Sequence, residues 1–192
     1  MAPFVGLTGG LGAGKSEALR LLGELGAATL STDAVVHELL QTGEMRDEIV
    51  ARLGPDVLRD GALDRSAIAS RVFGDDDARA WLEGVLWPRV GERVAAWRAG
   101  VAEDRVAVVG VPLLFEAGME KVFDRTIAVV ADEAVSERRA AARGHASPAE
   151  RAGRQLPQAE KAERADFTVQ NDGSLTELRE SLSLLLGKLE AK

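Results

Sequence analysis

The sequence predicts an α/β protein with a five-stranded parallel β-sheet flanked by helices. Its 192 residues suffice for one core domain that carries additional lobes. Five short runs rich in β-branched residues alternate with longer helical patterns, and this alternation is typical of a parallel sheet covered on both faces. The third and fourth runs are almost wholly apolar, so we expect them to be central strands.

The expected strands span residues 3–7, 27–30, 105–111, 125–131 and 166–170. A helix begins after the first strand, with Lys15 at its start. Residues 33–100 contain no convincing strand and are much longer than an ordinary crossover between parallel strands. We therefore expect a helical insertion there, in which Trp81, Trp87 and Trp97 contribute to core packing.

Two segments near the C-terminus have distinct patterns. Residues 137–164 contain seven basic and four acidic residues, a local basic excess in a chain that is acidic overall. Further on, Ser174 and Glu177 have the spacing of a capping box. Leucines then recur on one helical face, at positions 175, 178, 182, 185, 186 and 189. We expect this last segment to be a helix packed on the sheet.

Composition narrows the range of partners. The formal net charge of −7 disfavours non-specific binding to nucleic acids and anionic membranes, so an anionic ligand requires a local cluster of basic groups or amides. The absence of cysteine excludes disulfides, thiolate metal sites and a cysteine nucleophile, and it fits a cytoplasmic location. We find no secretory signal and no apolar run near the roughly 20 residues that span a bilayer. We expect a monomer or a weak oligomer, with small-molecule partners only.

A phosphate-binding loop follows the first strand. Gly9, four further residues, Gly14, Lys15 and Ser16 match the pattern G-x-x-x-x-G-K-[ST], between a strand and a helix as its mechanism requires. Glycines let the backbone amides turn toward phosphate oxygens, and the helix N-terminus adds positive partial charge. We expect Lys15 to reach the β- and γ-phosphates and the Ser16 hydroxyl to ligate Mg²⁺. The dinucleotide-binding pattern G-x-G-x-x-G does not fit. Its third glycine position is occupied by Lys15 when the pattern starts at Gly10 and by Glu17 when it starts at Gly12.

The loop alone leaves several classes of phosphate chemistry open. A guanine-nucleotide switch should contain an Asn-Lys-x-Asp segment, and the sequence has none. A coupling ATPase could use Asp132 and Glu133 after an apolar strand, although an N-cap and first-turn role in the following helix is the favoured interpretation. A kinase needs a carboxylate near the loop and arginines over the transferring group. Asp33, after the second strand, and Arg139 with Arg143, four apart on one helix face, meet these needs.

The combined motifs resemble those of dephospho-CoA kinases, over nearly the whole chain. In order, they are LTGGLGAGKS, STDAVVHEL, VPLLFEAGMEKVFD, the two arginines and ADFTVQNDG. The resemblance implies transfer of the γ-phosphoryl group of ATP to the ribose 3′-hydroxyl of dephospho-CoA, the last step of coenzyme A synthesis. It also implies a core like that of nucleoside monophosphate kinases, a helical substrate domain and a lid.

The resemblance assigns roles to the matching positions. Asp33 is the expected general base, and Lys15, Arg139 and Arg143 complete the expected catalytic set. The expected ATP-binding residues are Gly10, Leu11, Gly12, Ala13, Gly14, Lys15, Ser16, Glu17, Arg143, Asn171 and Gly173. The expected acceptor-binding residues are Thr8, Asp33, His37, Pro112, Leu113, Leu114 and Glu116. His37 is the least specific of these, because a lone helical histidine is more often structural. Gln155 matches a glutamine that follows the lid.

The resemblance also divides the chain. Residues 1–32, 101–136 and 165–192 are the expected nucleotide-binding core, 33–100 the acceptor-binding insertion and 137–164 the lid. Two positions depart from the family pattern: Trp87 replaces a common histidine, and Ser136 replaces a usual glutamine. Two alternatives remain: a P-loop kinase of another nucleotide or small metabolite, and a P-loop ATPase or switch that phosphorylates nothing.

Overall fold

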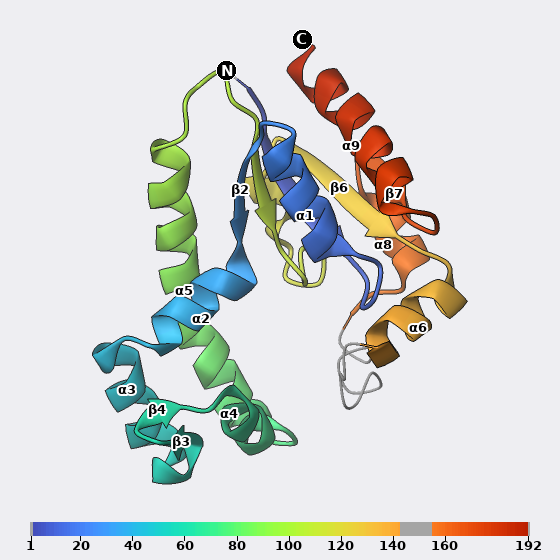
Figure 1. Ribbon diagram of the computed structural model, residues 1–192. Helices are drawn as coiled ribbons and strands as arrows, with labels where there is room; N and C mark the ends of the chain where they lie inside the picture. The colour runs from blue at the N-terminus through green and yellow to red at the C-terminus, as the bar shows by residue number, and fades with distance from the viewer. Residues whose placement is uncertain (1, 143–154, 192) are drawn as a thin grey trace. The chain divides into compact units, whose positions relative to one another are not determined.

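The computed structural model describes residues 2–142 and 155–191 (Figure 1). The chain forms two compact units. The first consists of Met1–Thr32 with Gly100–Lys192, and the second of Asp33–Ala99.

The first unit contains the five-stranded parallel sheet that the sequence predicts. Its strands lie in the order β2-β5-β1-β6-β7. They are β1 (Phe4–Gly9), β2 (Ala28–Ser31), β5 (Ala107–Gly110), β6 (Arg125–Val130) and β7 (Phe167–Gln170). Leu7 of β1 pairs with Gly110 on one side and with Ile127 on the other. The expectation that the third and fourth strands are central is confirmed, since both flank β1 and neither is an edge strand.

Helices cover both faces of this sheet (Figure 1). On one face, α1 (Lys15–Glu24) and α9 (Leu175–Glu190) enclose the main apolar core, which includes Leu7, Leu22 and Leu182. Successive strand residues point to opposite faces, so Thr8 points away from this core. There its hydroxyl meets Lys161 of α8 (Gln158–Arg164). The unit also contains α6 (Glu133–Ala142) and the 3₁₀ turn η2 (Met119–Val122).

The predicted capping box and leucine face of α9 are present. Ser174 accepts from the Glu177 backbone, and Glu177 accepts from the Ser174 backbone. Leu178, Leu182, Leu185, Leu186 and Leu189 are buried. Leu175 is 59% exposed, so its assignment to the buried face is wrong. As the first helical residue, it lies ahead of the part of α9 that enters the core.

The second unit is helical with one small hairpin. Its elements are α2 (Thr32–Leu40, starting one residue before the unit), α3 (Gly43–Leu53), η1 (Pro55–Val57), β3 (Leu58–Arg59), β4 (Ala62–Leu63), α4 (Arg65–Val72) and α5 (Asp76–Ala99). The expectation that this region contains no strand is wrong, because β3 and β4 pair antiparallel. Asp60 and Gly61 connect these strands. Their φ angles of 52° and 78° are both positive, as a two-residue hairpin turn requires.

The tryptophans of α5 are only partly buried. Trp81 lies under the guanidinium of Arg52, whose Cζ is 5.9 Å from the ring centroid. The fully buried side chains of the second unit are smaller and include Met45, Ile49, Val57 and Val90. The tryptophans therefore contribute only in part to packing, and smaller side chains form the fully buried core of this unit.

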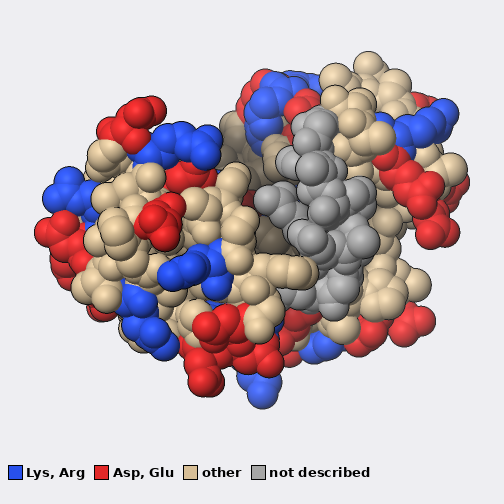
Figure 2. Space-filling model, turned by 90° about the horizontal axis from the view of Figure 1, so that it is seen from below, with Lys and Arg blue, Asp and Glu red and all other residues tan. Residues whose placement is uncertain are grey.

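The described surface is charged and mixed in sign. Figure 2 shows basic and acidic side chains interspersed over one face. No helix within residues 2–142 and 155–191 is both long and apolar enough to cross a membrane.

Candidate active site

The phosphate loop occupies the turn between β1 and α1. The Ala13 amide donates to the Gly10 carbonyl at 3.1 Å, and the Ala18 amide to the Gly14 carbonyl at 2.9 Å. Gly14 caps α1 with φ of 96°, a left-handed conformation that favours glycine. The N-terminus of an α-helix presents backbone amides and a positive partial charge, so this end of α1 is suited to phosphate oxygens.

Neighbouring segments press closely on the loop. A Cβ atom on Gly12, whose φ is 78°, would lie 2.1 Å from the Ser136 carbonyl oxygen of α6. A Cβ atom on Gly14 would lie 2.2 Å from Asn171 Nδ2, and this amide donates to the Ala13 carbonyl at 2.8 Å. The loop therefore has the shape that its glycines permit, supported by α6 and by the residues after β7.

Arg139 fastens the residues that support the loop. Its Nη1 donates to the Asn171 carbonyl at 2.7 Å and its Nη2 to the Gly173 carbonyl at 3.4 Å. Asn171 is buried. The structure thus brings Arg139, Asn171 and Gly173 together beside the loop. Arg143, the second predicted arginine, lies outside the described residues.

The segment before α6 is bound to the same turn. The Asp132 amide donates to Asp172 Oδ1 at 2.6 Å, and this hydrogen bond, followed by one from Gln170, holds the pKa of the Asp172 carboxyl below its ordinary value. Helix α6 begins at Glu133, and the Ser136 amide donates to the Asp132 carbonyl at 2.9 Å. Asp132 thus occupies the position before a helix that its N-cap interpretation requires.

Three predicted residues form the first turn of α1. Lys15 extends toward the end of β5, since a Cβ atom on Gly110 would lie 3.7 Å from its Nζ. Ser16 is exposed, so its hydroxyl is open to a ligand. The Glu17 carboxylate accepts from Arg20 Nε at 3.2 Å, so its negative charge is paired with a cation of the same helix.

The predicted acceptor segment follows β5. Pro112 and Leu113 are partly exposed, whereas Leu114 and Thr8 have no exposed surface. The Thr8 hydroxyl donates to the Pro112 carbonyl at 3.2 Å. Because fully buried side chains offer no surface to a ligand, Thr8 and Leu114 support this segment from within.

Glu116 is bound on one of its oxygens. Oε1 lies 2.9 Å from Lys161 Nζ and accepts from the Leu156 amide at 2.8 Å. Burial by itself raises the pKa of this carboxyl, but the hydrogen bonds outweigh that effect and lower the pKa below its ordinary value. Lys161, which the sequence shows only as one charge of a basic segment, thus lies beside the predicted acceptor segment.

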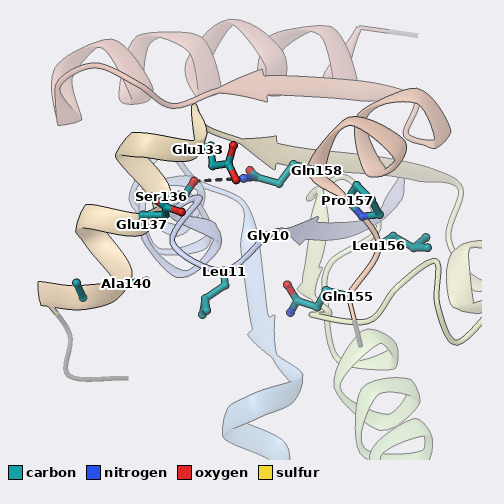
Figure 3. Close-up of a pocket in the computed structure, with 11 residues that line it drawn as sticks. Gly10, Leu11, Glu133, Ser136, Glu137, Ala140, Gln155, Leu156, Pro157 and Gln158 are labelled. Carbon is teal, nitrogen blue, oxygen red and sulfur yellow. Dashed lines mark hydrogen bonds between the residues drawn. The ribbon is translucent and has the colours of Figure 1, made fainter. Parts of the chain in front are cut away.

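A cavity of about 610 Å³ lies beside the loop (Figure 3). Residues of α6 line one side, residues 155–158 the other, and Gly10 and Leu11 belong to the loop. Gln158 connects the sides: its Nε2 donates to Ser136 Oγ at 3.2 Å, and its Oε1 accepts from the Ala131 amide at 3.0 Å. Ser136, one of the two departures from the family pattern, thus has a defined partner.

In the second unit, Asp33 and His37 lie one turn apart on α2, and both are exposed. His37 Nε2 lies 2.8 Å from Gln41 Nε2. A separate cavity of about 340 Å³ borders His37. Its lining includes Arg46 and Arg65 and contains no acidic residue. This cavity has the charge that an anionic group requires.

Known proteins resemble this chain over nearly its full length. A family model described as dephospho-CoA kinase matches residues 3–177. A protein named dephospho-CoA kinase from Protochlamydia amoebophila is 37% identical over 194 residues, covering 97% of this chain and 96% of that protein. One of the same name from Chromobacterium violaceum is 41% identical over 184 residues, 92% of this chain and 89% of that protein. The crystal structure of TT1252 from Thermus thermophilus has a TM-score of 0.81 at 34% identity and covers 98% of both chains. The chain therefore belongs to the dephospho-CoA kinase family of ATP-dependent kinases.

Proposed function

We propose that this protein transfers the γ-phosphoryl group of ATP to the ribose 3′-hydroxyl of dephospho-CoA, giving coenzyme A and ADP. The observation that carries this proposal is the family match over residues 3–177. The bond between the γ-phosphorus and its bridging oxygen breaks, and a bond from the 3′-oxygen to phosphorus forms. The hydroxyl proton passes to a carboxylate of the protein.

On the donor side, we assign the phosphates to the loop and Lys15. The left-handed glycines of the loop and the N-terminus of α1 suit a polyphosphate, and the Lys15 ammonium offsets its charge. Ser16 fits a role as ligand of Mg²⁺, because its exposed hydroxyl is a hard oxygen donor at the same helix end. When bound, the ion would neutralise charge that develops on the phosphates.

On the acceptor side, we assign Asp33 as the base that orients and deprotonates the 3′-hydroxyl. Dephospho-CoA also carries a diphosphate, which needs cationic partners. The cavity lined by His37, Arg46 and Arg65 supplies them, and His37 follows Asp33 by one turn of α2. We therefore assign the second unit to acceptor binding and this cavity to the diphosphate.

The remaining assignments rest on the resemblance and on composition. We assign residues 137–164 to a lid, with Arg139 and Arg143 over the transferring group, where closure would exclude water. A cytoplasmic monomer or weak oligomer that binds neither nucleic acid nor membrane fits the charge of −7 and the lack of cysteine.

A panel of acceptors tests the function. Purified protein is incubated with ATP, Mg²⁺ and one of dephospho-CoA, AMP, adenosine or a simple sugar, and ADP and the phosphorylated product are quantified. We expect dephospho-CoA to be the preferred acceptor, with coenzyme A as product. Preferred phosphorylation of AMP or a sugar would overturn the assignment. ADP release without any phosphorylated acceptor would instead support a coupling ATPase, whose turnover should then depend on Asp132 or Glu133.

The assignment of Asp33 has its own test. Asp33→Asn removes the proton acceptor but retains the side-chain size, so we expect kcat to fall by about 10²–10⁴-fold. The dissociation constant of ATP, measured by calorimetric titration, should change little. Asp56→Asn, at another exposed position of the second unit, is the matched control. Near-parental turnover of Asp33→Asn would exclude Asp33 as the base.

A further inference from the structure

Lys161 of α8 is buried completely, with no exposed surface. Lysine is almost never fully buried unless it is paired, because the ammonium loses its hydration. Here Nζ donates to the Pro112 carbonyl at 2.9 Å, lies 2.9 Å from Glu116 Oε1 and reaches Thr8 Oγ1 at 3.5 Å. Its three contacts match the three donors of an ammonium group.

These contacts connect three segments of the first unit. Thr8 is the second-last residue of β1, directly before the phosphate loop, and Pro112 follows β5. The two residues are also bound to each other, since Thr8 Oγ1 donates to the Pro112 carbonyl. Lys161 thus joins α8 to the strand ends where the loop and the predicted acceptor segment begin.

Stabilisation of the fold is a poor explanation for the ion pair between Lys161 and Glu116. A buried ion pair commonly gains no stability over apolar side chains of similar volume, because both ions lose hydration. Moreover, Glu116 Oε2 is buried without a hydrogen-bond partner among the described residues. Burial also lowers the pKa of the Lys161 ammonium, against the opposing effect of Glu116, and nearby Lys15 lowers it further. Burying this ion pair therefore costs free energy that apolar side chains at the same positions would not cost.

We propose that Lys161 is a positioning residue for phosphoryl transfer: it holds Thr8, the Pro112 carbonyl and Glu116 so that the phosphate loop and the acceptor segment keep the alignment that transfer needs. It acts through these residues and does not touch the substrates. This inference rests on the proposed kinase function. It predicts a loss in the transfer step rather than in ATP binding.

The test must separate positioning from folding. Lys161→Met alone leaves Glu116 buried without its cation and is expected to destabilise the protein. We therefore compare Glu116→Gln with the double variant Glu116→Gln/Lys161→Met, in which no charge is left unpaired. Lys188→Met, at an exposed position of α9, is the control for loss of a lysine.

The double variant should recover the thermal midpoint that Lys161→Met loses. Its kcat should nevertheless remain at least about tenfold below that of Glu116→Gln, with the ATP dissociation constant within about threefold. A folded double variant with the kcat of Glu116→Gln would overturn the proposal, and so would parallel losses in ATP binding and turnover. If the parental protein prefers another acceptor of the panel, the same variants are measured with that acceptor, so that failure of the substrate assignment does not decide the role of Lys161.

Discussion

At the scale of single residues, the loop glycines are set by contacts as much as by backbone angles. Gly12→Ala would force a methyl group against the Ser136 carbonyl, which is backbone and cannot rotate away. A left-handed residue with a side chain costs about 1–2 kcal/mol before this clash is counted. We therefore expect Gly12→Ala to lose at least about 1 kcal/mol of unfolding free energy and most of its ATP affinity.

Chemical denaturation and calorimetric titration with ATP would measure both effects. Gly91→Ala is the matched control, because it lies in α5 with open space around the added methyl group. In a helix this change should be neutral or stabilising by about 0.5–1 kcal/mol. An ATP affinity of Gly12→Ala equal to that of Gly91→Ala would contradict the role of the close contact.

Single residues also differ in how readily the sequence predicts their surroundings. The glycine, lysine and serine of the loop are adjacent in the chain, so their spacing was sufficient to predict them. The partners of Lys161 are remote: Pro112 lies 49 positions away and Thr8 lies 153. Within the segment AEKAER, nothing distinguishes a buried lysine from a solvated one. Only the fold brings these residues together.

At the scale of elements, α9 allows a matched comparison of two leucines. Leu182 has no exposed surface, whereas Leu184 is 72% exposed. Leu182→Ala should cost about 2–5 kcal/mol of unfolding free energy, because it removes buried contacts and leaves a cavity. Leu184→Ala should change the free energy by no more than about 0.5 kcal/mol. Denaturant unfolding of both variants measures these losses. Similar losses of unfolding free energy in the two variants would contradict the placement of Leu182 on the side of α9 that faces the core.

The start of α9 also predicts a dependence on pH. Hydrogen bonds from the Ser174 amide, and then from its hydroxyl, hold the pKa of the Glu177 carboxyl below its ordinary value. A carboxyl with a lowered folded-state pKa stabilises the fold above its unfolded pKa, and this contribution is lost as the pH falls. The stability difference between the parental protein and Glu177→Gln should therefore shrink from about pH 6 to about pH 3. A constant difference in denaturation measurements over this range would exclude the ionised capping box.

Elements differ in how well their sequences predict them. The five core strands were predictable because burial on both faces selects continuous apolar, β-branched runs. The hairpin of β3 and β4 was missed because two-residue strands are too short for a periodic pattern. Its only local signal is the Asp60-Gly61 pair, which is a known hairpin turn sequence. Turn chemistry was thus the informative feature where periodicity failed.

At the scale of the whole molecule, the sequence contains a nucleotide-binding pattern and, after the second predicted strand, a long insertion. The insertion was predictable from its length, since a crossover between parallel strands rarely needs so many residues. The strand order was not, because it depends on where each crossover returns to the sheet. In the proposed arrangement, ATP depends on the unit with the loop, whereas the acceptor depends on Asp33–Ala99 as well as on the segment after β5.

Thermal unfolding with each substrate tests this division. A ligand at about 100 times its dissociation constant stabilises the folded state by about 2.7 kcal/mol, which raises the midpoint by several degrees. We expect Lys15→Met to lose the shift caused by ATP but to keep that caused by dephospho-CoA, because Lys15 contacts only donor phosphates in the proposed arrangement. Arg65→Gln should show the opposite pattern, because it weakens the cavity assigned to the acceptor diphosphate. Arg93→Gln, at an exposed position of α5, should keep both shifts. Loss of both shifts in either single variant would show that the substrates share their binding determinants.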